Sequence, residues 1–179
     1  MVFSSDFEGI EPVLTALFET VFTASDGAAE GTLVGELARR LLTETAPDDR
    51  HVFVARDIET VVGCIIFTRL CFPDDDRTVF LMAPVAVATA WQGRGVGQGL
   101  IEYGIDGLRT LGVEVTVTYG DPRFYLRVGF EQVPVGVVRP PLPLGRPEGW
   151  MARRLTDRPL GAIKGCSVCV DALQDAAYW

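Results

Sequence analysis

Apolar side chains recur at helical spacing in two stretches near the start of the chain. The first follows Pro12, which is tolerated in a first helical turn, and its stripe consists of Val13, Leu14, Leu17, Phe18, Val21 and Phe22. The second opens at Thr32 and continues with Leu33, Leu37, Leu41 and Leu42. We therefore expect two helices, joined by a flexible segment at residues 27–31.

The next part of the chain has the pattern of a β-hairpin. Residues 51–55 and 61–70 are strand-like apolar runs on either side of residues 56–60. A polar turn at residues 73–77 follows, with aspartate at positions 74 to 76. These carboxylates could attract an amine, but the charged tip of a loop is more often solvated, so we expect solvated side chains.

A strand, a helix and a second strand are expected in the middle of the chain. Residues 78–87 and 113–119 have strand patterns, and between them apolar positions recur at helical spacing at Val96, Leu100, Tyr103 or Gly104, Leu108 and Leu111. This βαβ unit makes the two strands parallel, with a right-handed crossover. We expect at least one helix glycine to permit close packing against the sheet, among Gly99, Gly104 and Gly107.

The last part of the chain predicts less regular structure. Residues 130–138 are a strand candidate, whereas the prolines of residues 139–147 predict a loop. Residues 150–155 are expected to form the last strand and residues 170–179 a short helix. With 179 residues and 48% apolar positions, the chain suits one domain with a substantial core.

The formal net charge of −8 changes the range of expected partners. It argues against nucleic acid, because binding to a phosphate backbone needs a basic face. It suits a cationic amine, although an acidic surface also simply keeps a protein in solution. The first residues do not resemble a signal peptide, and no segment approaches the roughly 18–20 apolar residues of a membrane span. A cytoplasmic protein without a membrane partner is the default expectation.

Four cysteines raise the question of a metal site. Cys166 and Cys169 have C-x-x-C spacing, but Cys64 and Cys71 are seven residues apart and His51 is the only histidine. A structural zinc site usually needs two closely spaced pairs, so we expect no metal. A redox role for Cys166 and Cys169 has little support, because no helix start clearly follows that would lower a thiol pKa.

Glycines crowd at the start of the predicted central helix, within residues 92–98, here called the glycine loop. Backbone N–H groups at such a helix start are unpaired, and the helix dipole adds partial positive charge, so the segment can hold a phosphate. Gln92 and Arg94 add donors. The Rossmann fingerprint G-x-G-x-x-G does not fit, because Gln98 occupies the position of its third glycine. The P-loop motif does not fit either, because it requires a lysine and this segment has none. A phosphorylated cofactor is the first hypothesis; a turn that merely caps a helix is the alternative.

The glycine loop also resembles a known motif. Gln92, Gly95 and Gly97 match the pattern Q/R-x-x-G-x-G/A of the acetyl-CoA pyrophosphate loop in the GNAT superfamily of N-acetyltransferases. A second motif lies after the second central strand.

In that second motif, Gly-Asp-Pro opens residues 120–130, and Tyr125 stands four residues before Gly129 and Phe130. This segment looks most like the YhbS-like group of predicted acetyltransferases. The resemblance extends over about residues 52–138.

The resemblance implies a mixed α/β (α+β) fold, with a mostly antiparallel twisted sheet, a splayed parallel strand pair and helices on both faces. Residues 1–179 would form a single GNAT-type domain, with the N-terminal helix pair as one wall of the acceptor-substrate cleft.

The resemblance also implies acetyl-CoA as the acetyl donor. The glycine loop would hold its pyrophosphate and the preceding strand its pantetheine, through Val85, Ala86, Val87, Gln92, Gly93, Arg94, Gly95, Val96, Gly97 and Gln98.

Tyr125 is the general acid that the resemblance implies. A tyrosine phenol is mostly protonated at neutral pH, so it can give a proton to the departing CoA thiolate; aromatic packing is the alternative role. The general base is not identified, with Asp121, Glu114 and the aspartates of residues 74–76 all open. Thr118 stands near a position where many relatives have an asparagine, which puts the CoA contact made there in doubt.

Two functions follow from these patterns. The first is acetyl-CoA-dependent transfer of an acetyl group to a primary amine of a small molecule or a protein, by direct attack on the thioester. The alternative is a non-catalytic CoA-ligand sensor or interaction module with the same fold. No sequence motif identifies the acceptor amine. The sequence also leaves open whether the protein forms a homodimer.

Overall fold

Eight strands form the sheet of this protein in a computed structural model that describes residues 1–179. They lie in the order β1-β2-β3-β4-β5-β7-β6, and β8 pairs with β3. The pairs β1–β2, β3–β8, β5–β7 and β6–β7 are antiparallel, whereas β4–β5 is parallel. The strands are β1 Val2–Ser4, β2 Arg50–Asp57, β3 Thr60–Cys71, β4 Val79–Val87, β5 Val115–Tyr119, β6 Glu131–Gln132, β7 Trp150–Arg154 and β8 Val168–Cys169.

Four α-helices complete the mixed α/β fold, which agrees with the fold class expected from the sequence. They are α1 Glu11–Asp26, α2 Ala28–Glu44, α3 Val96–Thr110 and α4 Pro122–Tyr125. Helix α3 connects the parallel strands β4 and β5, so the predicted βαβ unit is confirmed. None of the helices combines the length and the apolar character that crossing a membrane would require.

Contacts within the chain divide it into two compact units. The first consists of Met1–Phe67 and Pro84–Gly104, and the second of Thr68–Ala83 and Ile105–Trp179. Strands β3 and β4 and helix α3 contribute residues to both units.

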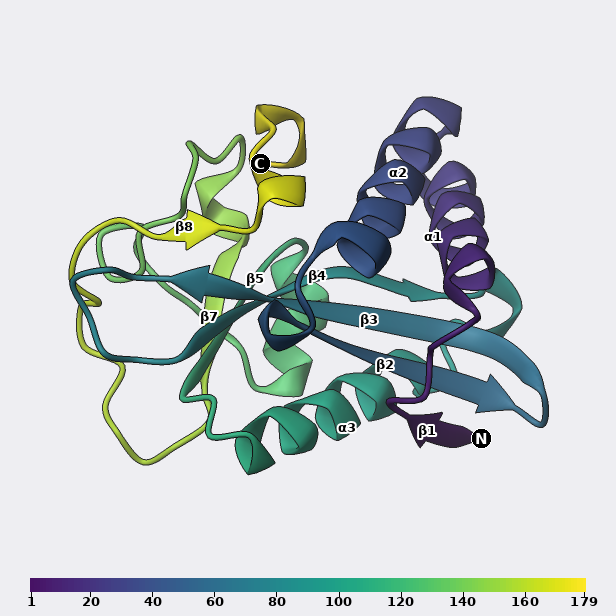
Figure 1. Cartoon of the computed structure of the whole chain (residues 1–179), viewed down its shortest axis with the longest axis horizontal. Coiled ribbons are helices and arrows are strands. Elements are labelled where there is room, and N and C mark those ends of the chain that lie inside the picture. The colour runs from purple at the N-terminus through teal and green to yellow at the C-terminus, as the bar shows by residue number, and fades with distance from the viewer. The chain divides into compact units, whose positions relative to one another are not determined.

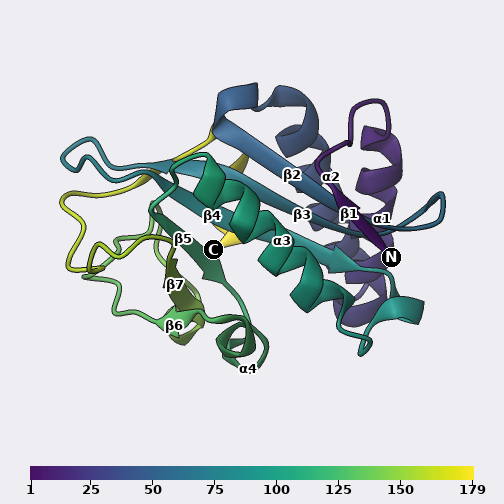
Figure 2. The ribbon, with the colours of Figure 1, turned by 90° about the horizontal axis from the view of Figure 1, so that it is seen from below.

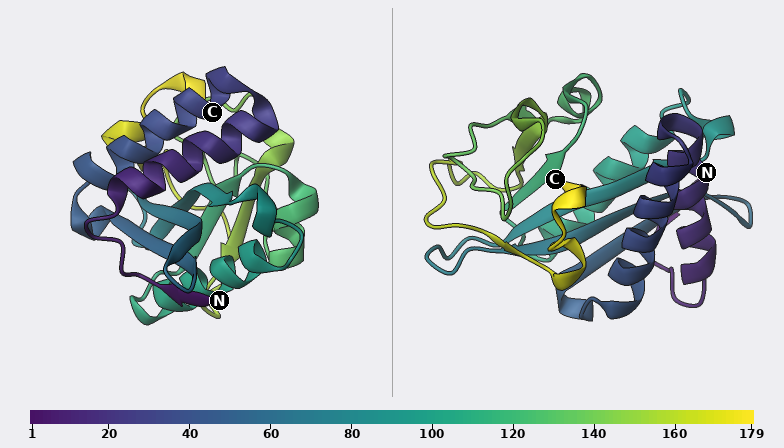
Figure 3. Two further views of the ribbon diagram at one scale, coloured as in Figure 1. Left: turned by 90° about the vertical axis from the view of Figure 1, so that its right-hand side faces the viewer. Right: turned by 90° about the horizontal axis from the view of Figure 1, so that it is seen from above.

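In the first unit, α1 and α2 pack side by side (Figure 3). Of the segment expected to be flexible, Gly27 caps both helices and residues 28–31 belong to α2, which begins at Ala28 and not at Thr32. The reason is helix packing. A β-carbon on Gly31 would overlap Thr23 Oγ1, and one on Gly35 would lie 2.9 Å from Glu19 Cβ. The glycines therefore let the two helices approach closely, and the prediction of a flexible segment was wrong.

The hairpin of β2 and β3, also in the first unit, turns at residues 58–59 as predicted. The first part of α3 covers one face of it, and α1 and α2 lie on the other face (Figures 1 and 2). A β-carbon on Gly104 would lie 2.8 Å from Phe67 Cε2, and one on Gly99 would lie 2.8 Å from Phe3 Cζ. The prediction that a helix glycine permits close packing is confirmed at both positions.

In the second unit, β5 lies between β4 and β7 (Figure 2). The parallel register places Val79 to Met82 opposite Val115 to Thr118. On its other side, β5 pairs over its full length with β7, which confirms the last predicted strand. Valine and threonine dominate β5, and these β-branched side chains suit a strand that is buried on both faces.

The strand expected over residues 130–138 is reduced to β6, Glu131–Gln132. Val133 N still donates to Trp150 O, but Pro134 has no N–H to continue the ladder, and Val137 N turns back to Pro134 O. This part of the prediction was wrong beyond the first residues.

Toward the end of the chain, residues 139–147 form the expected loop. The short helix expected over residues 170–179 is replaced by two 3₁₀ turns, Asp171–Leu173 and Ala176–Tyr178. Strands β1 and β8 were not predicted, because two or three residues are too few to show an alternating pattern.

Candidate functional site

The glycine loop follows β4 through a short 3₁₀ helix, Thr89–Trp91. Gly93 and Gly95 have φ angles of +71° and +79°, and each has open space where a β-carbon would stand. Only glycine adopts this backbone conformation readily. Residues 92–95 are exposed. The glycines of the motif therefore create an exposed turn of bare backbone.

Two side chains brace this turn. Gln92 Nε2 donates a hydrogen bond to Val87 O at 2.9 Å, which ties the loop to the last residue of β4. The Arg94 guanidinium lies over the Trp91 ring, 5.3 Å from its centroid. The loop conformation is thus held from both sides of Gly93.

Helix α3 begins directly after the turn. Its first helical hydrogen bond runs from Gly99 N to Gly95 O at 2.9 Å, so the N–H groups of Val96, Gly97 and Gln98 precede it. Such N–H groups, together with the dipole of a helix of this length, favour an anion at the helix start. The residues present therefore fit a pyrophosphate group.

The last part of β4 carries the other predicted donor-site residues. The parallel register with β5 ends at the pair Met82–Thr118, while β4 continues to Val87. Val85 and Val87 are half-buried, and Ala86 between them is buried. Their side chains alternate as in a regular strand, and Pro84 causes no break in β4.

Tyr125 is the last residue of α4 in the second unit. Asp121 Oδ1 caps this helix by accepting from Arg123 N at 2.9 Å, and Pro122 occupies its first turn. The helix folds back on the end of β5, so that a β-carbon on Gly120 would lie 2.7 Å from Tyr125 Cε2. The ring also packs edge-on against Phe130, with centroids 5.8 Å apart.

The surroundings of the Tyr125 phenol favour its neutral form. Burial raises the pKa of this phenol, and the negative charge of Asp121 adds to the rise; a hydrogen bond with the Thr118 side chain acts in the opposite direction. Thr118 is itself fully buried, and its Oγ1 donates to Met82 O at 3.0 Å. Tyr125 therefore keeps its proton at neutral pH.

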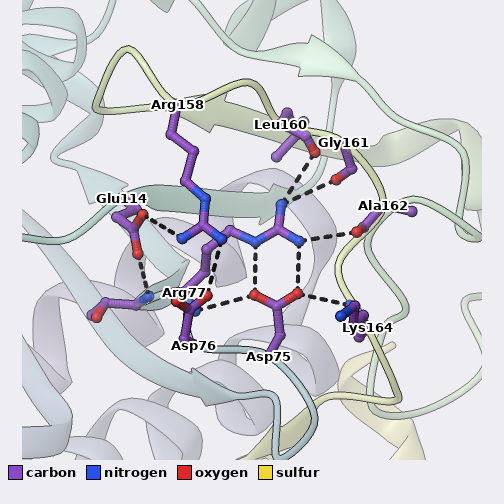
Figure 4. A network of polar contacts seen from close by, with 10 residues as sticks. Asp75, Asp76, Arg77, Glu114, Arg158, Leu160, Gly161, Ala162 and Lys164 are labelled. Carbon is purple, nitrogen blue, oxygen red and sulfur yellow. Dashed lines mark hydrogen bonds and ion pairs between the residues drawn. The ribbon is translucent and has the colours of Figure 1, made fainter.

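Among the aspartates at positions 74 to 76, Asp74 and Asp76 are exposed as expected, whereas Asp75 belongs to a buried polar cluster (Figure 4). Asp75 and Arg77 are buried and joined by two hydrogen bonds, from Nε to Oδ1 at 2.8 Å and from Nη2 to Oδ2 at 2.7 Å. Arg77 also donates to the carbonyl oxygens of Leu160, Gly161 and Ala162. The Arg77 guanidinium holds the pKa of Asp75 well below its usual range. The expectation of solvated side chains was wrong for Asp75.

The other candidates for a general base are engaged as well. Glu114 accepts from Thr78 N at 3.1 Å and from Arg158 Nη1 at 3.1 Å, and Arg158 also pairs with Asp76 (Figure 4). Asp121 caps α4, and its hydrogen bonds with Arg123 lower its pKa. Asp75, Asp76, Glu114 and Asp121 therefore all have partners within the protein, and the general base stays unassigned.

The four cysteines are unpaired. Cys64 and Cys169 are buried, whereas Cys71 and Cys166 are exposed. Burial raises the pKa of both Cys64 and Cys169, which makes these two thiols poor nucleophiles.

The hydroxyl of Thr118 and the missing side chain of Gly120 both shape the surroundings of Tyr125. Sequence reasoning had no signal for either role. The contacts arise because α4 folds back on β5, and a local pattern does not encode that return.

Comparison with known proteins is consistent with this geometry. The sequence profile of the acetyltransferase (GNAT) domain matches residues 48–132. The chain is 34% identical over 142 residues to the uncharacterized N-acetyltransferase YjhQ of Escherichia coli, covering 76% of this chain and 77% of YjhQ. It is also 34% identical over 163 residues to the uncharacterized N-acetyltransferase YhbS of Escherichia coli, covering 89% of this chain and 88% of YhbS.

Solved structures agree. YhbS from Escherichia coli in complex with CoA matches with a TM-score of 0.79 at 26% identity, over 98% of this chain and 92% of that one. A GNAT family acetyltransferase from Brucella melitensis in complex with acetyl-CoA has the same fold, with a TM-score of 0.74 at 21% identity, over 96% of each chain. The chain therefore belongs to the GNAT family of N-acetyltransferases, and it is an acyltransferase.

Proposed function

We propose that this chain, acting as a single domain of residues 1–179, transfers the acetyl group of acetyl-CoA to a primary amine of a small molecule or a protein. The observation that carries the proposal is the glycine loop, with its positive φ angles at Gly93 and Gly95 and the unpaired N–H groups that open α3. Relatives whose names or structures include N-acetyltransferase and CoA support it.

The donor site is assigned to backbone groups. The N–H groups of Val96, Gly97 and Gln98 would bind the pyrophosphate, and Gly93 and Gly95 allow it to approach without meeting a side chain. Gln92 and Arg94 hold the loop in shape. The backbone of Val85, Ala86 and Val87 would bind the pantetheine, as the resemblance implies.

Tyr125 is assigned the role of general acid, which supplies the proton that the departing CoA thiolate needs. When bound, acetyl-CoA supplies an acetyl group activated as a thioester. Burial keeps the Tyr125 proton on Oη at neutral pH, where the phenol can give it to the departing thiolate. Phe124, the neighbour of Tyr125, cannot donate a proton and has a packing role.

The distribution of charge favours a cationic acceptor. Residues 1–59 contain twelve acidic and four basic side chains, which accounts for the whole formal net charge of −8. This stretch includes α1 and α2, the helix pair that the resemblance assigns to one wall of the acceptor cleft. A negative surface raises the local concentration of amines with more than one positive charge.

A thiol-release assay with acetyl-CoA tests the proposal and separates it from a non-catalytic CoA sensor. The panel should contain spermidine, an aminoglycoside, a lysine-containing peptide and a neutral amine of similar size. We expect acceptor-dependent release, faster with the cationic amines, and mass spectrometry should find one acetyl group on the acceptor. Tight binding of acetyl-CoA without release for any member of a broad panel would favour the sensor.

A further inference from the structure

Tyr125 lies in the middle of a short helical stretch in the second unit. Helix α4 passes without a break into a 3₁₀ turn, Leu126–Val128, and Gly129 ends the stretch with a left-handed φ of +73°. Asp121 caps the first end by accepting from Arg123 N. Because the stretch is so short, the position of Tyr125 depends on how both of its ends are held.

The second end is held by Arg153, a residue of β7. Arg153 Nη1 donates to Val128 O at 2.6 Å. That carbonyl belongs to the last residue of the stretch, and carbonyl groups at a helix end have no partner within the helix. The guanidinium supplies the missing donor, and a charged donor makes a stronger hydrogen bond than a neutral one.

The guanidinium also lies against the bare backbone of Gly129. A β-carbon at this glycine would lie 3.1 Å from Arg153 Nε and 3.2 Å from Arg153 Cζ. The arginine itself is placed by the sheet, because its backbone pairs with Thr116 of β5. The ring of Tyr125 rests on Gly120, just after the end of the same strand β5. Arg153 therefore ties the end of the helical stretch to the strands beside which the phenol lies.

Backbone hydrogen bonds connect this end of the stretch to Tyr125. Phe130 N donates to Tyr125 O at 3.2 Å, and Gly129 N donates to Leu126 O at 3.4 Å. The Phe130 ring is buried and packs edge-on against the Tyr125 ring, with centroids 5.8 Å apart. A shift of Gly129 would therefore move both the backbone and a ring neighbour of Tyr125.

We infer that Arg153 is a positioning residue for Tyr125, which fixes the place of the phenol by holding Val128 O and the backbone of Gly129. The inference rests on the proposed role of Tyr125 as general acid. Proton transfer requires the donor to be held within about 0.5 Å of the productive geometry, and groups on strands hold such positions better than groups on loops. Arg153 acts only through Tyr125, so its loss should affect kcat and not the affinity for acetyl-CoA.

Three variants and one label test the inference. Arg153→Met removes the guanidinium and keeps a long stem, and Arg153→Lys keeps a charged donor without the planar group. Arg154→Met is the matched control, because Arg154 is the next residue of the same strand, is exposed and loses the same charge. Labelling tyrosine at the ring carbon that bears the oxygen makes the phenol visible by NMR in the free protein, and Tyr125→Phe assigns its signal.

In Arg153→Met we expect the Tyr125 signal to shift, while the other signals of the four tyrosines stay in place. Arg153→Lys should shift the Tyr125 signal less and in the same direction, because an ammonium can donate to Val128 O but cannot lie flat against Gly129. Arg154→Met should leave the Tyr125 signal unchanged. Circular dichroism verifies that each variant is folded.

With a competent acceptor, kcat of Arg153→Met should fall about 10- to 100-fold, the range expected for a displaced catalytic group, with KM for acetyl-CoA within about twofold of the parent. In the Tyr125→Phe background, Arg153→Met should lower kcat no further, because the group that it positions is already gone. A merely structural role of Arg153 would lower kcat in both backgrounds.

An unchanged Tyr125 signal in a folded Arg153→Met protein, or an equal loss of kcat in both backgrounds, would overturn the inference. If Arg153→Met does not fold, Arg153→Lys decides, and a Tyr125 signal identical to that of the parent would then overturn it. The NMR comparison needs no turnover. If the parent transfers acetyl to no acceptor, the proposed function fails, while the NMR comparison still decides whether Arg153 holds Tyr125 in place.

Discussion

Two polar clusters of the second unit place buried groups in opposite chemical situations. In the cluster around Asp75 and Arg77, both carboxylate oxygens accept hydrogen bonds, and the guanidinium donates to Asp75 and to three carbonyl groups (Figure 4). At Tyr125, burial raises the pKa of the phenol and so favours its neutral form. Both oxygens of Asp75 are occupied by donors, whereas Tyr125 keeps the proton that we propose it transfers.

This difference in hydrogen bonding distinguishes residues with a structural role from residues with a chemical role, which the sequence alone does not distinguish. A buried charge is tolerated only when its partners are complete, and a complete set of partners leaves no lone pair for a substrate. A buried phenol needs a single partner and stays protonated at neutral pH. Asp75 therefore has a structural role, and Tyr125 is the residue that we propose for proton transfer.

Replacing Tyr125 by phenylalanine should have the largest effect on catalysis. The substitution keeps the ring and its packing but removes the only transferable proton, and general acids contribute typically about 10²–10⁴-fold. We expect kcat to fall by a factor in this range, while the free energy of unfolding changes by about 1 kcal/mol or less. Steady-state kinetics with a competent acceptor and urea denaturation measure the two quantities.

A Tyr125→Phe enzyme whose kcat stays within about twofold of the parent would assign Tyr125 to packing. Chemistry must be shown to limit the rate in the parent for this comparison to hold, because slow product release would mask the loss of the acid.

Asp75→Asn should show the opposite profile. It leaves the buried Arg77 without a counter-charge, and breaking a buried ion pair costs about 3 kcal/mol of stability. We expect a loss of this size in urea denaturation at pH 7, with kcat unchanged at a temperature at which both proteins are folded. A large loss of kcat in a folded Asp75→Asn protein would contradict the structural role.

The stability difference between the parent and Asp75→Asn should also depend on pH. Folding lowers the pKa of Asp75, so its contribution is complete above the ordinary aspartate pKa near pH 4 and is lost as the pH falls toward the folded-state value. The two denaturation curves should therefore converge in acid. A difference that stays constant from pH 7 to pH 2.5 would show that the ion pair is not its source.

Arg158→Ala should have the smallest effect. Its ion pairs with Asp76 and Glu114 lie at the surface, where solvent weakens them. We expect a change in melting temperature much smaller than that of Asp75→Asn. Equal changes would mean that the exposed and buried halves of the cluster contribute alike.

The parts of the fold that depend on local pattern could be predicted from the sequence. The hairpin of β2 and β3 and the βαβ unit follow from apolar spacing and turn residues. The glycine loop could be predicted because its geometry depends on glycines with positive φ angles that lie within a few residues of one another.

What the sequence could not supply depends on contacts between distant segments. The glycines of residues 27–31 indicated flexibility, yet Gly31 lies against Thr23 of α1. Asp75 was expected to be solvated, but it accepts hydrogen bonds from Arg77 and from Lys164 N. Arg77 in turn donates hydrogen bonds to carbonyl groups of residues 160–162. None of these contacts leaves a local signature.

Binding of acetyl-CoA by the glycine loop is the claim on which the proposed function depends, and calorimetry with a pair of glycine variants tests it most directly. Gly95 and Gly112 flank the two ends of α3 with φ angles of +79° and +77°, and both have open space for a side chain. Leucine at either position therefore carries similar backbone strain, and circular dichroism should verify that both proteins are folded. We predict that Gly95→Leu loses most of its affinity for acetyl-CoA, while Gly112→Leu binds like the parent. Equal affinity in all three proteins would contradict the assignment of the pyrophosphate to the glycine loop.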